Sequence, residues 1–99
     1  MLFEEPLEYY QAIASELVET INETWISIEI EAILLEDSIE LEVVYFRPDG
    51  SEESRVRSIM LADYFYELAR VVSNESKGLY KKCNFTLKSN GTFDVNFEY

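Results

Sequence analysis

Histidine is absent from the 99-residue chain, and cysteine, proline and glycine are scarce, with one, two and three residues. The absence of histidine removes the side chain that most often serves as a general base or a metal ligand. A single cysteine excludes an internal disulfide and a thiolate metal cluster. The three glycines mark turns and form no phosphate-binding loop. We therefore expect that the protein is not an enzyme and holds no cofactor.

Basic residues are missing from residues 1–46, which contain twelve acidic residues. Residues 47–99 contain eight of each sign, so the whole net charge of −12 lies in the first half. Such a charge repels phosphate backbones and attracts a cationic protein over long distances. We expect a basic protein partner and no direct binding to nucleic acid. Solubility alone is the alternative explanation, because many cytoplasmic proteins are acidic.

The chain has no uninterrupted apolar run of about 18 residues, so the sequence predicts no membrane-spanning helix. Its first residues, MLFEEPLEYY, are acidic where a signal peptide needs basic side chains. Together with the single cysteine, these features predict a cytoplasmic protein. The length and the apolar share of 47% fit a single domain over residues 1–99 with a packed core.

Hydrophobic periodicity divides the chain into seven elements. Helical spacing of apolar residues predicts two helices, over 5–22 and 60–74. Alternation with a period of two predicts five strands, over 26–34, 39–46, 51–59, 83–87 and 93–99. The order α-β-β-β-α-β-β predicts an α+β domain. We expect a mostly antiparallel five-stranded sheet with both helices on one face.

Alternation of faces also fixes the register of the first predicted hairpin. A tight turn at Glu36-Asp37 keeps the apolar residues of both strands on one side. The same register places Glu31 directly opposite Glu42, and a like-charge pair in this position is unfavourable by up to about 1 kcal/mol. A fold that keeps this pair either tolerates a small cost or uses the charge.

In the last predicted hairpin, the faces decide between two turns. A two-residue turn at Asn90-Gly91 would set Phe85 against Asn96 and mix the faces. A three-residue loop, Ser89-Asn90-Gly91, sets Phe85 against Val95. We predict the longer loop, with Gly91 in the left-handed conformation that glycine adopts without steric cost.

Outward-facing acidic residues are the candidates for binding a partner. They are Glu16, Glu19, Glu23, Glu29, Glu31, Glu40 and Glu42. The pairs on the first hairpin are weaker candidates for a divalent ion, because hard cations need convergent oxygens and a strand presents a flat row. We expect Cys83 to be a buried, inert side chain. Tyr9, Phe46 and Tyr66 fit the inward pattern less well and are candidates for exposed interface residues. For Tyr66, which lies one residue off the apolar stripe of the second predicted helix, a position at the edge of the core is an equal alternative.

Five segments carry a resemblance to a known family over about residues 7–99: YYQAIASELVETI, ETWISIEIEA, ELEVVYFRPDG, ADYFYELARVV and CNFTLKSNGTFDVNFEY. With them the chain resembles the YezG-like immunity proteins, the antitoxins that accompany secreted polymorphic nuclease toxins. It departs from that family in a shorter second helical region and in Leu79-Tyr80, which stand near the place of a tryptophan.

The resemblance implies a cytoplasmic inhibitor that binds a toxin domain and blocks its nuclease action. It does not imply which residues make the contact. The alternative is an acidic adaptor, or a domain that binds a small ligand or a metal, without a toxin partner.

Overall fold

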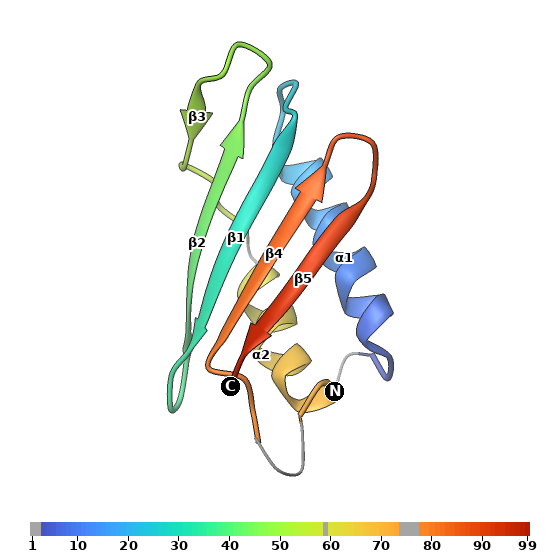
Figure 1. Ribbon diagram of the computed structural model, residues 1–99, viewed down its shortest axis with the longest axis vertical. Coiled ribbons are helices and arrows are strands. Elements are labelled where there is room, and N and C mark those ends of the chain that lie inside the picture. The colour runs from blue at the N-terminus through green and yellow to red at the C-terminus, as the bar shows by residue number, and fades with distance from the viewer. Residues whose placement is uncertain (1–2, 59, 74–77) are drawn as a thin grey trace.

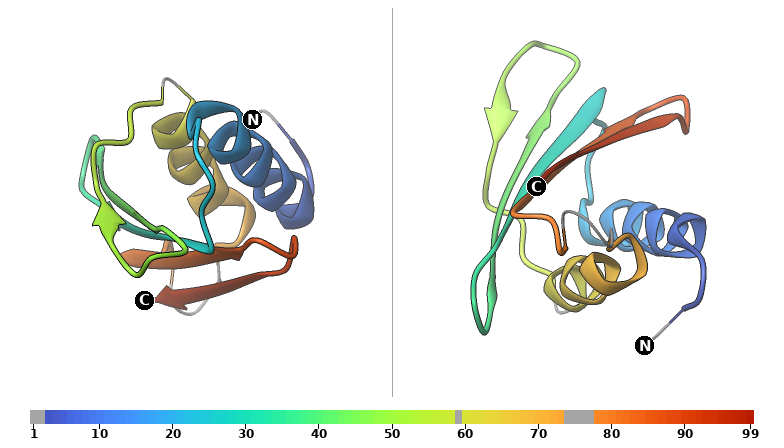
Figure 2. Two further views of the ribbon diagram at one scale, coloured as in Figure 1. Left: turned by 90° about the horizontal axis from the view of Figure 1, so that it is seen from above. Right: turned by 60° about the horizontal axis from the view of Figure 1, so that its bottom comes forward.

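A computed structural model describes residues 3–58, 60–73 and 78–99, and these form seven elements in the predicted order. The helices are α1 (Pro6–Thr20) and α2 (Leu61–Val71). The strands are β1 (Ser27–Leu34), β2 (Ile39–Phe46), β3 (Glu52–Glu53), β4 (Lys82–Lys88) and β5 (Phe93–Glu98). All pairings are antiparallel, in the order β3-β2-β1-β4-β5 (Figure 1). Both helices lie on one face of this sheet (Figure 2), so the predicted α+β fold is confirmed.

The first hairpin has the register that alternation predicts. The Leu35 N–H donates to the Ser38 carbonyl oxygen at 2.9 Å, across the turn at Glu36-Asp37. Glu31 lies opposite Glu42. The like-charge pair is therefore present in the structure.

The last hairpin closes with the three-residue loop. The Lys88 N–H donates to the Thr92 carbonyl oxygen at 2.8 Å, and Gly91 has a φ of +90°. Phe85 lies opposite Val95, as predicted. The two hairpins join because β4 pairs with β1, which places β1 in the centre of the sheet.

The core fills the space between the sheet and the helices. Its fully buried large side chains include Ile13 from α1, Phe65 from α2, Ile28 from β1 and Phe85 from β4. Tyr80 is also buried, and its hydroxyl donates to the carbonyl oxygen of Phe65. This hydrogen bond satisfies the one polar atom of the Tyr80 side chain inside an apolar environment.

The third strand is much shorter than the predicted range 51–59. β3 contains only Glu52 and Glu53, and the chain then leaves the sheet and crosses to α2 (Figure 1). Of the residues that follow β3 up to Ser58, only Val56 is apolar, and it packs against the core. A strand needs several apolar side chains on one face to stay docked, so this segment does not continue the sheet.

The helices are also shorter than predicted. The buried side of α1 includes Tyr9 with Ile13 and Leu17, while Leu7 is exposed. Residue 74, the last of the predicted second helix, lies outside the described residues. Tyr9, a candidate for an exposed interface residue, is fully buried, so that prediction is wrong. The reason is Phe3, which folds back over α1: its N–H donates to the Tyr9 hydroxyl at 3.2 Å and its ring packs edge-on at 5.0 Å. Phe46 and Tyr66 are half-buried.

Two leucines of α1 test which side of this helix is buried. Leu17 is 0% exposed and Leu7 is 53% exposed. Leu17→Ala should lower the free energy of unfolding by about 2–5 kcal/mol, because it leaves a cavity in the core. Leu7→Ala, the matched control, should change it by less than about 0.5 kcal/mol. Urea denaturation followed by circular dichroism measures both, and equal losses would contradict this arrangement of α1.

Candidate functional site

The face of the sheet that points away from the helices is polar and rich in carboxylates. Antiparallel sheets commonly leave one face to the solvent. Strand pairing brings seven acidic residues to this face, which we call the acidic face: Glu29, Glu31, Glu40, Glu42, Glu52, Asp94 and Glu98. The basic residues of the same face are Lys82 and Lys88. The acids come from four of the strands and the lysines from β4, and the resulting surface of net negative charge has no helix over it (Figure 2).

Four of the seven predicted partner-binding residues meet on the acidic face. Glu29, Glu31 and Glu42 line a shallow hollow of about 270 Å³ together with Glu52. Glu40 lines an adjoining hollow with Glu31 and Glu42. Their carboxylates are therefore presented together, as the first-hairpin register predicts.

Lys82 compensates one part of the acidic face. Its Nζ lies 3.3 Å from Glu31 Oε2 and 3.9 Å from Glu98 Oε2. Within residues 3–58, 60–73 and 78–99, no ion pair involves Glu29, Glu40 or Glu42. Glu52 on β3 and Asp94 on β5 have no ion pair within these residues either, so four of the five carboxylates of the acidic face without one lie on β1, β2 and β3.

Three residues of the acidic face were missed from the sequence: Glu52, Asp94 and Glu98. The alternation of apolar and polar residues in the last hairpin already indicates that Asp94 and Glu98 face outward. This was not enough to place them on one surface with the acids of the first hairpin, because nothing in the local pattern indicates that β4 pairs with β1.

The other three predicted residues, Glu16, Glu19 and Glu23, lie apart from the acidic face, on α1 and just after it. Glu19 is exposed. Glu16 is half-buried, and its Oε1 accepts a hydrogen bond from Ser58 Oγ at 2.6 Å. Because α1 covers the opposite side of the sheet, the seven predicted residues do not form one surface (Figure 2).

Glu23 is held by the end of the first hairpin. Arg47 Nε and Nη2 donate to its two carboxylate oxygens at 2.7 and 3.0 Å, and the Tyr45 hydroxyl donates to the same carboxylate. Arg47 Nη2 also lies 3.4 Å from Glu53 Oε2. The hydrogen bonds from Arg47, and then that from Tyr45, lower the pKa of Glu23. This bidentate ion pair connects the segment after α1 to β2 and β3.

Neutralising Glu23 should reveal this internal role. A carboxyl group with a lowered native pKa adds stability above its unfolded pKa, and that stability is lost as the pH falls through the native pKa. Glu23→Gln should therefore lower the melting temperature at pH 7, and the difference from the parent should shrink under acid conditions. Glu19→Gln, on the exposed side of α1, is the matched control and should have little effect. A parent-like melting curve for Glu23→Gln at pH 7 would contradict the internal role.

Cys83 is fully buried on the inward face of β4, as predicted. It lies opposite Ala32 on one side and Phe97 on the other. Burial raises the pKa of its thiol to about 12 and also raises the pKa of the Tyr80 phenol. A thiol that stays protonated is a poor nucleophile, so this environment favours a packing role for Cys83.

These buried groups predict a loss of stability in alkali. Because the native pKa of Cys83 lies above its unfolded value, its contribution is complete below about pH 9 and is lost as the pH rises toward 12. The Tyr80 phenol acts in the same direction. Urea denaturation at increasing pH should show a falling free energy of unfolding. A disulfide reagent at pH 8 should modify Cys83 only after unfolding, and rapid modification of the native chain would contradict its burial.

Neither a metal centre nor a membrane helix is found in the part of the chain that the structure describes. No group of three or more Cys, Asp or Glu side chains there is placed to hold a metal ion. No helix among these residues combines the length and apolar character needed to cross a membrane. Comparison with models of known protein families gives no match, and comparison with curated proteins gives none either. The resemblance to the YezG-like family therefore stays a prediction.

Proposed function

We propose that the protein is a cytoplasmic immunity protein that binds a bacterial nuclease toxin and neutralises it. The observation that carries this proposal is the acidic face, on which seven carboxylates and two lysines project from one sheet. A nuclease must present lysine and arginine side chains to the phosphates of its substrate. The charge of the acidic face is opposite in sign to that of such a surface. The resemblance of the chain to the YezG-like proteins supports the same function.

The opposition of Glu31 and Glu42 is consistent with a cationic partner. In the free protein the pair is unfavourable by up to about 1 kcal/mol, and of these two carboxylates Lys82 contacts only that of Glu31. A lysine or arginine of a partner placed over the pair would convert this repulsion into attraction. The charge therefore has a use that a neutral pair at the same two positions would not have.

Electrostatic complementarity acts mainly on the rate of association. Steering of oppositely charged surfaces brings association rate constants toward about 10⁸–10⁹ M⁻¹s⁻¹ at low salt. An inhibitor that protects its own cell must capture the toxin quickly, so a concentrated charge serves this function. The proposal requires no bond to be made or broken by the protein itself.

A double variant of the acidic face tests the proposal. The proposal predicts that a basic nuclease-like domain is encoded beside the gene of this chain, and that domain is the probe, or else the protein recovered with the chain by affinity purification from its host. Glu31→Lys with Glu42→Lys should slow association with that domain in stopped-flow measurements and weaken inhibition of its nuclease activity. Raising the ionic strength should also slow the association of the parent protein with that domain, because salt screens the attraction between the two charged surfaces.

The matched control is Glu4→Lys with Glu19→Lys, which makes the same change in net charge at exposed positions away from the acidic face. This variant should associate more nearly like the parent. Equal slowing by both variants would show that only the total charge matters. Stabilisation of the isolated protein by a nucleotide or a metal ion, without any effect on a nuclease, would favour the alternative of a small-ligand domain.

A further inference from the structure

The edge of the sheet at β2 is open along most of its length. β3 pairs only with Tyr45 and Phe46, at the end of β2. Residues of an antiparallel strand alternately direct their N–H and C=O groups to one neighbour and to the other. The Arg47 N–H donates to Ser51, on the β3 side, so Val43 and Leu41 direct their backbone groups to that same side. Among the described residues, no strand lies there to pair with them.

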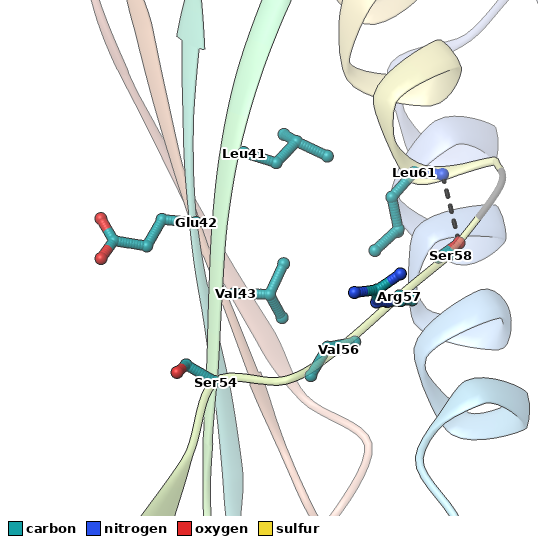
Figure 3. A pocket seen from close by; sticks show the side chains of 8 residues that line it. All are labelled: Leu41, Glu42, Val43, Ser54, Val56, Arg57, Ser58 and Leu61. Carbon is teal, nitrogen blue, oxygen red and sulfur yellow. Dashed lines mark hydrogen bonds between the residues drawn. The ribbon is translucent and has the colours of Figure 1, made fainter.

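A cavity of about 540 Å³ lies beside this open edge. Its apolar walls are Leu41 and Val43 on β2, Val56 on the segment that crosses to α2, and Leu61 at the start of α2. The polar residues Glu42, Ser54, Arg57 and Ser58 line the rest of it. Figure 3 shows that the chain diverges from β2 after Ser54, and that the apolar side chains point into the opening while Glu42 points away from it. The cavity is thus placed to receive the inward side chains of a strand added to β2.

The outward side chains of an added strand would meet carboxylates. Glu40 and Glu42 lie on the acidic face at this edge, and both are exposed. A strand that pairs with β2 places its residues directly opposite Glu40, Leu41, Glu42 and Val43, alternating between the two faces. The edge therefore selects a segment in which basic and apolar residues alternate.

We infer that the open edge of β2 binds an extended basic segment of a protein partner by strand addition. The bound segment runs antiparallel to β2 and continues the sheet over residues 39–44, with lysine or arginine opposite Glu40 and Glu42 and apolar side chains in the cavity beside Leu41 and Val43. Main-chain hydrogen bonds supply affinity and the alternating side chains supply selectivity. This inference rests on the proposed function, to which it adds the mode by which the partner docks.

A second copy of the chain fits this edge poorly. Two-fold antiparallel pairing of β2 with itself opposes like charges in three registers, which set Glu42 against Glu42, Glu42 against Glu40, or Glu40 against Glu40 of the copy. The register that sets Val43 against Val43 avoids this, but it leaves only residues 42–44 to pair, because β3 already pairs with Tyr45. The other edge of the sheet, β5, has two outward acids, Asp94 and Glu98. It is less favourable for a basic strand, because Glu98 is already contacted by Lys82 and by Asn84.

A short peptide of alternating lysine and valine, acetylated and amidated, is the probe. Amide hydrogen exchange of the full chain should show protection of Leu41 and Val43 when the peptide binds at low salt. A peptide of the same composition with paired lysines and paired valines is the control, because it carries the same charge without the alternation. It should bind at least about threefold more weakly and leave these two amides unprotected.

N-methylation of the peptide tests the main-chain bonds without changing the protein. Methyl groups on the valine nitrogens remove the donors that face β2 and should weaken binding about tenfold. Methyl groups on the lysine nitrogens, which face solvent, are the matched control and should change binding by less than about threefold. Equal binding of both methylated peptides, protection of Val95 and Phe97 on β5 in place of Leu41 and Val43, or no binding at millimolar peptide would overturn the inference.

The complex with a nuclease separates this inference from the proposed function. Inhibition of the nuclease without protection of Leu41 and Val43 would overturn strand addition and leave the proposed function standing. Protection of these amides by the alternating peptide, in a protein that inhibits no nuclease, would support the edge as a binding site and overturn the proposed function alone.

Discussion

The arrangement of the molecule depends on the position of β1, which pairs along both of its edges and is buried on only one face. Its inward side chains, including Ile28 and Ile30, pack against the helices, while Glu29 and Glu31 project to the other side. Because β2 and β4 flank it and are in turn flanked by β3 and β5, the outward residues of all five strands come into one surface. The same pairing that closes the core therefore assembles the acidic face.

The local pattern of the sequence was enough to predict both hairpins, because a one-residue slip would move every apolar side chain to the solvent. This constraint chose the longer loop at Gly91 and set Glu31 opposite Glu42, and both are found. The constraint that apolar side chains share one face predicts less where apolar residues are few. The segment after Glu53 offers Val56 alone before Ser58, so the predicted strand over 51–59 had no face with which to dock.

Long-range pairing and single contacts across the fold could not be predicted. The pairing of β4 with β1 joins residues about fifty positions apart, and no local period records it. The same holds for Glu23, an outward acid by its position in the sequence, which is bound by Arg47 from the far end of the first hairpin. Tyr9 was also misplaced, because only the folded chain brings Phe3 back over it. The sequence therefore predicted four of the seven acids that face outward on the sheet, and not how the candidate residues divide between two sides of the molecule.

The central position of β1 also has a consequence for the order in which the chain is synthesised. As the nascent polypeptide leaves the ribosome, α1, β1 and β2 emerge before β4, with all their acidic residues and before Arg47 and Lys82, which later contact Glu23 and Glu31. One edge of β1 stays bare until β4 has been made. Closure of the sheet therefore waits for β4, and until then the carboxylates on β1 and β2 repel a neighbouring copy of the same charge from that edge.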